Sequence, residues 1–201
     1  MKAKTMSIEI DDFKIKGPSE RMAQLLIAGL LTQALPPVAN VQPITAHSIP
    51  ALGDYWPGQG GFNAGLVAAR GDVPAHYLII AKDDVGAHEW GARGVESGAT
   101  SKTDGLANTV VLCNAEGKHP AANACTEHRA EGHNDFYLPA CAELYHCWVN
   151  VPDLFAKDSW YWSSSQRSAD YAFGMLFGDG GQDFNGKGNE LRVRPVRRFF
   201  I

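Results

Sequence analysis

The sequence has no apolar run long enough to cross a membrane. Its longest candidate, LLIAGLL at residues 25–31, is far shorter than the about 20 residues that a membrane-spanning helix needs. The opening MKAKTMSIEIDDF carries two lysines, but neither an apolar segment nor a small-residue cleavage site follows them. We therefore expect no membrane span, no signal peptide and no export by the usual route, which leaves the bacterial cytoplasm or a virus particle.

The chain also lacks an excess of positive charge. It has 18 Lys and Arg residues against 22 Asp and Glu residues, which gives a net charge of −4. Nucleic acid is therefore not the expected partner. Basic residues gather only near the C-terminal end, where we expect a strand with outward-facing charges; they are Lys187, Arg192, Arg194, Arg197 and Arg198.

Cysteine is scarce, and its spacing does not favour a metal site. A structural zinc site needs two close pairs of ligands, and here only Cys125-x2-His128 is close, since Cys141-x5-Cys147 is loose. Without a signal peptide, reduced thiols are expected. We predict buried or incidental thiols and surface histidines; the residues concerned are Cys113, Cys125, Cys141, Cys147, His119, His128, His133 and His146.

Signatures of catalysis are missing as well. The sequence contains no G-x-S-x-G elbow, Walker A loop, H-E-x-x-H helix or dinucleotide-binding fingerprint. The acidic pair Asp83 and Asp84 follows a predicted strand and is expected to form a solvated turn. His88 and Glu89, beside Trp90, are expected in a surface turn. We predict no catalytic residue and no cofactor.

The first 48 residues predict a small element of their own. Residues 7–16 read as a short strand with a bend near Asp11 and Asp12. Gly17 and Pro18 are expected to start a helix that runs to about residue 33. The proline-rich segment 35–50 reads as a linker. We therefore divide the chain into an attachment or oligomerisation element at 1–48 and a domain at 49–201.

The pattern in residues 49–201 is typical of an α+β fold. A hairpin is expected from strands at 62–70 and 76–82, followed by helices at 103–117 and 138–150. The second helix should bury Leu144, Cys147 and Trp148. Short strands are expected at 160–166, 171–178, 181–185 and 190–201. Strands therefore cluster at both ends of the domain, and we expect the N-terminal and C-terminal strands to be adjacent.

Three segments, taken in order, resemble a known family. GHNDFYLPACAEL (132–144), WYWSSSQ (160–166) and ELRVRPVRRF (190–199) are similar to the Lcl C-terminal domain family, named for a collagen-like bacterial adhesin. GDYWPGQGGFNAGL and HYLIIA further resemble its phage and prophage members. The resemblance covers roughly residues 50–201. It implies a C-type-lectin-like fold with irregular loops that form a ligand face.

The same fold serves formylglycine-generating enzymes and the variable proteins of diversity-generating retroelements, so the fold alone does not choose a function. No cysteine follows Cys147, which argues against the enzymes. The calcium-binding triplets of C-type lectins are missing. One glycine-rich segment does supply oxygen ligands of the kind that calcium prefers: Asp179, Asp183, Asn185, Asn189 and Glu190. Their spacing matches no known calcium-binding loop, so we predict no metal site.

The last third of the chain combines scaffold residues with candidate binding residues. The scaffold is expected to include Trp162, Phe177, Leu191 and Val193. Between them, aromatic and small polar residues resemble the composition of an antibody paratope, although the same residues also favour ordinary turns. The candidate ligand-binding residues are Arg167, Asp170, Tyr171, Gly174, Leu176, Gly181, Asp183, Phe184, Asn185, Gly188 and Asn189.

The function that this combination favours is recognition of a cell-surface protein or glycan by a tail-associated phage or prophage protein. The resemblance implies that the C-terminal loops are a diversified surface. Other virion proteins are expected as partners, and a homo-oligomer is compatible with the 1–48 element. The alternatives are a structural virion protein with no external ligand and an enzyme built on the same fold.

Overall fold

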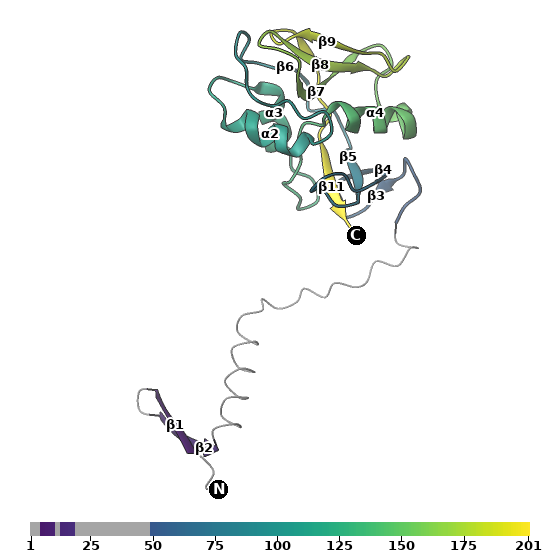
Figure 1. Ribbon diagram of the computed structural model, residues 1–201. Helices are drawn as coiled ribbons and strands as arrows, with labels where there is room; N and C mark the ends of the chain where they lie inside the picture. Colours follow the sequence, from purple (N-terminus) through teal and green to yellow (C-terminus); the bar gives the residue numbers. More distant parts are fainter. Residues whose placement is uncertain (1–4, 11–12, 19–48) are drawn as a thin grey trace. The chain divides into compact units, whose positions relative to one another are not determined.

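The computed structural model describes residues 5–10, 13–18 and 49–201 (Figure 1). The chain divides into two compact units, Met1–Ala46 and His47–Ile201, close to the boundary predicted from the sequence. No helix in the described residues is long and apolar enough to cross a membrane.

The first unit contains a β-hairpin rather than one bent strand. Strands β1 (Thr5–Ile10) and β2 (Phe13–Pro18) pair antiparallel, with Ile10 opposite Phe13. The prediction for residues 7–16 is wrong because the chain reverses direction between these two residues. Gly17 and Pro18 end β2 instead of starting a helix. The predicted helix up to residue 33 and most of the linker lie outside the described residues.

The second unit is mixed α+β, with two curled sheets. The five-stranded sheet has the order β6-β10-β7-β8-β9, and its only parallel pair in the described chain is β10 with β7. The four-stranded sheet has the order β11-β5-β4-β3 and is antiparallel. The strands are β3 (Tyr55–Trp56), β4 (Gly61–Val67), β5 (His76–Ala81), β6 (Ala87–Glu89), β7 (Trp160–Gln166), β8 (Tyr171–Leu176), β9 (Gln182–Gly186), β10 (Glu190–Arg192) and β11 (Val196–Phe200).

This topology confirms the predicted hairpin of β4 and β5, which carries an irregularity between Asn63 and Leu66. It also confirms that the last strand shares a sheet with the first strands of the unit, because β11 pairs with β5. The segment predicted as one strand at 190–201 is two strands, β10 and β11, and they belong to different sheets.

The described part of the second unit has three α-helices: α2 (Gly105–Asn114), α3 (Pro120–Glu127) and α4 (Cys141–Asn150); a short 3-10 turn, η2 (Pro152–Leu154), follows α4. Helices α2 and α4 were predicted, and the Asp104 carboxylate caps α2 by accepting a bond from the Ala107 N–H at 3.0 Å. Helix α3 was missed because its small residues give no clear apolar stripe. Figure 1 shows α2 and α3 beside each other and α4 beneath the β7–β9 strands.

Two hydrophobic clusters form the core. The first joins the four-stranded sheet to α4 and to one face of β7 and β8, through residues that include Ile80, Leu144 and Tyr161. Trp148, predicted as buried, is only partly buried against it. The second cluster packs α2 and α3 against Trp90 and Trp162. The predicted scaffold is confirmed, since Trp162, Phe177 and Val193 are buried and Leu191 packs on the second cluster; all four are core contacts.

The basic residues near the C-terminal end are not an outward-facing row, and that prediction is wrong. Lys187, Arg194, Arg197 and Arg198 are buried, and only Arg192 is exposed. Each buried arginine meets a carboxylate: Arg194 pairs with Asp84, Arg197 with Asp135, and Arg198 with Asp104 and Glu143. A buried guanidinium needs such partners because desolvation of an unpaired charge is costly.

Candidate functional site

Besides the buried Met175, strands β8 and β9 place four exposed or half-buried side chains on one face of the five-stranded sheet. In their register Phe173 lies opposite Phe184 and Met175 lies opposite Gln182. Because side chains alternate along a strand, Tyr171, Phe173, Gln182 and Phe184 project to the same side. We call these four residues the aromatic face. The β9 strand is an edge strand, so the face ends at the border of the sheet.

Tyr171 and Phe184 form the exposed centre of the aromatic face. Their ring centroids are 5.2 Å apart in an edge-to-face arrangement. They remain 42% and 47% exposed, respectively. Two large rings that hold each other in place while facing solvent give a contact area with little entropy left to lose on binding. Exposed aromatic side chains that lie together are a candidate interaction surface.

Cationic side chains border the aromatic face. The Arg167 guanidinium lies 5.9 Å from the centre of the Phe184 ring, and the Lys102 ammonium lies 4.3 Å from that of Phe173. Lys102 also donates a hydrogen bond to the Gln166 carbonyl oxygen at 2.9 Å. Within the described part of the chain, neither cation has a carboxylate partner, so both can meet an anionic or polar group of a ligand.

An open groove of about 660 Å³ runs beside Phe173 and Gln182. Its opposite wall comes from the start of α4 and from Lys102, and it includes Arg70 and Tyr145. A second hollow of about 430 Å³ shares Arg70 and Tyr145 with the groove and continues toward β4 and β5. The aromatic face is therefore one end of a longer concave surface. Volumes of this size are typical of ligand sites.

The residues predicted from the sequence do not form one contiguous site. Tyr171 and Phe184 lie on the aromatic face. Strand alternation sends a second group to the opposite face, where Gly174 is buried and Asp183 is exposed. The third group lies in the turns at the two ends of the strands. The opposite face carries Gly174, Leu176, Asp183 and Asn185, and the turns carry Arg167, Asp170, Gly181, Gly188 and Asn189.

Two of these turns lie side by side at the Arg167 end. The Lys187 N–H donates to the Asp170 carbonyl oxygen at 2.9 Å, which links the β7–β8 turn to the β9–β10 turn. The Asp170 side chain pairs with Arg93 at 3.4 Å on the surface. Gly188 and Asn189 are exposed, whereas Gly181 lies at the far end, in the β8–β9 turn.

Lys187 anchors the turn that carries Gly188 and Asn189. Its side chain is fully buried, and its ammonium group donates to the Val95 carbonyl oxygen at 2.7 Å and to Gln166 Oε1 at 2.9 Å. The Trp90 ring lies beneath it, with 4.6 Å to the centroid. Burial lowers the pKa of Lys187, although the charges of Glu96 and Asp170 oppose this shift.

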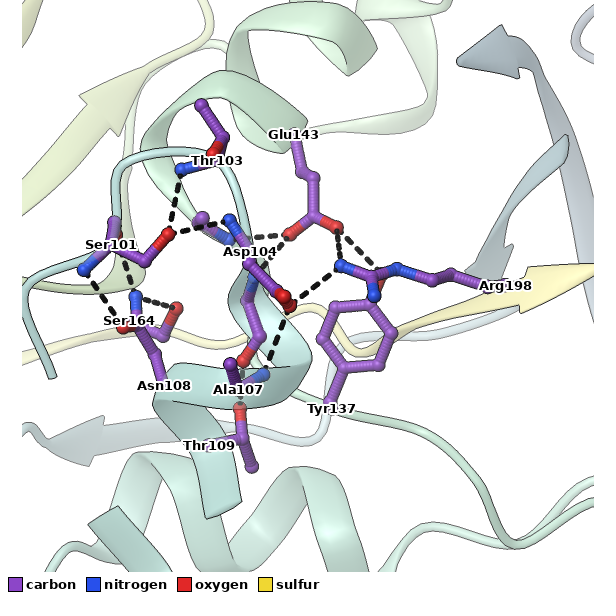
Figure 2. Close-up of polar contacts among 12 residues, drawn as sticks. Ser101, Thr103, Asp104, Ala107, Asn108, Thr109, Tyr137, Glu143, Ser164 and Arg198 are labelled. Atoms are coloured by element: carbon purple, nitrogen blue, oxygen red, sulfur yellow. Dashed lines mark hydrogen bonds and ion pairs between the residues drawn. The ribbon is translucent and has the colours of Figure 1, made fainter. Parts of the chain in front are cut away.

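A buried polar network supports the other wall of the groove (Figure 2). Glu143 Oε2 accepts bonds from the N–H groups of Ala140, at 2.8 Å, and Gly105, at 3.1 Å, so one carboxylate joins the starts of α4 and α2. Its Oε1 accepts from the Tyr137 hydroxyl at 2.7 Å and from Arg198 Nη2 at 3.2 Å. The network therefore fixes α4, whose first turn lines the groove.

In this network one guanidinium, Arg198, faces two carboxylates, Asp104 and Glu143. Burial raises the pKa of Glu143, although the Ala140 N–H, the Tyr137 hydroxyl and Arg198 oppose the shift. Burial also raises the pKa of Tyr137. For Asp104, burial acts in the upward direction, but the Ala107 N–H and the Arg198 guanidinium outweigh it and lower the pKa. Both Glu143 oxygens are engaged, which suits a structural role better than proton transfer.

The same close-up shows why α2 begins with polar residues on its inner side. Asn108 donates to the Ser101 carbonyl oxygen at 2.7 Å and to Ser164 Oγ at 3.2 Å. The Thr109 hydroxyl donates to the Gly105 carbonyl oxygen at 2.7 Å and accepts the Leu138 N–H at 3.1 Å. These bonds tie α2 to β7 and to the segment before α4.

The other polar residues singled out in the sequence serve the fold. Asp84 is not in a solvated turn: it accepts bonds from Arg192, Arg194 and the Tyr161 hydroxyl. His88 and Glu89 belong to strand β6 rather than to a turn. In the described residues no group of three or more His, Cys, Asp or Glu side chains could hold a metal ion. All four cysteines are free, with Cys125 and Cys147 buried.

Several residues of the concave surface were missed from the sequence. Phe173 could have been found, because it alternates with Tyr171 along one strand. Lys102, Arg70 and Tyr145 come from distant segments and carry no local signal. A comparison with models of known protein families and a comparison with curated proteins both find no match for the chain.

Proposed function

We propose that the chain is a non-enzymatic receptor-binding protein whose aromatic face recognises a cell-surface protein or glycan. The observation that carries the proposal is the exposed, mutually packed pair Tyr171 and Phe184. Arg167 and Lys102 lie at its border, and the groove beside Phe173 extends it. Aromatic anchors surrounded by adaptable polar groups are typical of recognition surfaces.

The proposal includes a C-type-lectin-like fold of the Lcl C-terminal domain type, carried on a phage or prophage tail. Two curled sheets and a last strand that returns beside the first strands of the unit support this assignment. The three sequence segments that carry the resemblance lie at positions important for the fold. Glu143, Trp162 and Arg198 stand within or beside them, and all three are buried.

Diversification of the surface is part of the same proposal. The exposed residues Arg167, Tyr171, Phe184 and Asn189 occupy β8, β9 and the adjoining turns, while the buried scaffold lies between them. A neighbouring reverse transcriptase gene and a near-copy of the last part of the coding sequence would be expected beside the gene. If both are absent, the surface is a fixed one and this part of the proposal is wrong.

The direct test compares a double variant on β8 and β9 with a double variant on β9 alone. Tyr171→Ala/Phe184→Ala removes the centre of the aromatic face, and Asp183→Ala/Asn185→Ala alters the opposite face. Labelled protein, clustered on beads to supply avidity, is incubated with candidate host cells. We expect the first variant to bind at least about 30-fold more weakly, since truncation of an aromatic anchor costs about 2 kcal/mol or more. The second variant should bind like the parent.

Both variants must melt like the parent for the comparison to hold. Equal binding by the parent and the Tyr171→Ala/Phe184→Ala variant would exclude the aromatic face as the receptor site. If the clustered parent binds no cell type in a panel, the second candidate function takes precedence. That candidate is a structural virion protein, which is favoured by exposed apolar side chains at Leu106, Val110 and Phe200.

A further inference from the structure

Helix α2 exposes large apolar side chains to solvent, whereas a helix that packs only against its own core would bury them. Apart from Leu112, the side that it buries is small or polar. By contrast, Leu106 is 39% exposed and Val110 is 53% exposed. A helix with apolar residues on both sides is normally covered on both sides. The buried residues are Gly105, Asn108, Thr109 and Leu112.

A cleft of about 300 Å³ continues this exposed surface from α2 to strand β11. Leu106, Val110 and Cys113 line it on the helix side, and Phe200 lines it on the strand side. Phe200 is 53% exposed. We call Leu106, Val110, Cys113 and Phe200, with the cleft between them, the α2–β11 patch.

The outer edge of β11 opens into the same cleft. Val196 exchanges both of its backbone hydrogen bonds with Tyr137, on the side of β11 away from β5. In an antiparallel strand the bonding direction alternates, so the backbone groups of Arg198 and Phe200 point the same way as those of Val196. Beyond Tyr137 they meet no backbone partner in the described residues. An unpaired edge of this kind can accept another strand.

The patch has no free charge to attract a charged partner. The cleft lining contains one carboxylate, Asp135, and one guanidinium, Arg198. Asp135 pairs with Arg197, and Arg198 pairs with Glu143 and Asp104. The fitting partner is therefore an apolar surface that also offers an unpaired strand edge.

We propose that the α2–β11 patch binds the same patch of a second copy of this chain, with the two β11 strands antiparallel across a twofold axis. An isologous contact needs a surface that is complementary to itself, and an antiparallel strand edge meets that condition. Phe200 stands beside the cleft, so each copy offers both a projecting ring and an apolar hollow. This inference does not depend on the receptor-binding proposal.

The size of the patch suits the centre of such an interface. From their exposed fractions, the side chains of Leu106, Val110 and Phe200 offer roughly 300 Å² of apolar area. A standard interface buries about 800 Å² on each partner, of which somewhat more than half is non-polar. The patch supplies most of that apolar share, and the polar residues around the cleft supply the rim.

The test measures the molar mass of the full chain in solution by light scattering and sedimentation over a range of concentrations. Val110→Glu brings an unpaired carboxylate into the centre of the patch from each copy. We expect the parent to be dimeric and the dissociation constant of the variant to rise at least about 100-fold. Val149→Glu is the matched control, because it changes a valine of similar exposure, 56%, on helix α4.

Modification of Cys113 provides a second measurement, since this exposed thiol lines the cleft. Its rate of alkylation should be lower in the concentrated parent than in Val110→Glu. A monomeric parent at high concentration would overturn the proposal. So would a dimer that Val110→Glu leaves intact, because association would then use another surface, such as residues 1–48. At concentrations low enough for the parent to be monomeric, both variants should unfold at the temperature of the parent.

Discussion

The Arg198 guanidinium and the Glu143 carboxylate form a buried ion pair, with 3.2 Å between Nη2 and Oε1. The two side chains are 6% and 4% exposed, and they link strand β11 to the starts of α2 and α4. Removal of one member of such a pair leaves the other charge buried without compensation.

Arg198→Met should therefore lower the free energy of unfolding by about 3–5 kcal/mol. Both Glu143 and Asp104 lose their cation in this variant. Arg192→Met is the control: it removes an arginine that pairs with Asp84 at 3.0 Å but is 46% exposed, so a loss of less than about 1 kcal/mol is expected. Urea unfolding measures both values. Similar losses in the two variants would show that burial does not determine the strength of the pair.

Four histidines predict a loss of stability at mildly acidic pH. Burial lowers the pKa of His76, His119, His128 and His146 below the ordinary value of about 6.5. Below that pH the unfolded chain takes up protons while the folded imidazoles stay neutral. The stability is therefore fully present above about pH 6.5 and declines as the pH falls through this value toward the folded pKa values.

Each histidine contributes at most about 1.4 kcal/mol per pH unit to this decline. Urea unfolding between about pH 7.5 and 5.5 should show the slope. His119 is a useful position to test, because its Nε2 is buried and has no hydrogen-bond partner among the described residues. His119→Leu should reduce the dependence of the unfolding free energy on pH by the contribution of one histidine, which is at most about 1.4 kcal/mol per pH unit. An unchanged slope in this variant would mean that the folded and unfolded chains take up the proton of His119 alike.

Lys187 gives a prediction for the turn that follows β9. Lys187→Met should cost about 1–3 kcal/mol, because the Val95 carbonyl oxygen and Gln166 Oε1 lose a donor. The apolar replacement avoids the desolvation of the ammonium group, which keeps the loss moderate. The amides of residues 187 and 189 donate to the carbonyl oxygens of Asp170 and Gly186, and their hydrogen exchange should accelerate more than exchange at β5 amides such as Ile79. A uniform acceleration would instead indicate global destabilisation without a specific role in this turn.

The sequence was informative where a local pattern exists. Alternation and turn residues predicted β4, β5, β7 and β8, and the segment 103–117 was predicted as the helix that the structure places at Gly105–Asn114. The tertiary partners of the arginines could not be predicted, because Arg198 meets Asp104 and Glu143 across 94 and 55 residues of chain. Without those partners, charged residues in a strand are expected to face water.

The candidate site was predicted only in part, for a similar reason. Tyr171 and Phe184 were named from composition, but composition does not separate the two faces of a strand pair. The register of β8 with β9 separates them, and it moves Asp183 and Asn185 away from the aromatic rings. Helix α2 shows a related limit. Its sequence is apolar, yet only the structure shows that Leu106 and Val110 point away from the core.

Strand β11 determines when the hydrophobic core of the second unit can be completed during translation. It contributes Val196 to the first hydrophobic cluster and the cation that Asp104 and Glu143 both require, and it follows every other strand of the unit along the chain. The core is therefore incomplete while β11 is still inside the ribosome. We expect nascent chains that stop short of Val196 to stay open and to be removed by proteases, so that only chains translated through β11 survive in the cell.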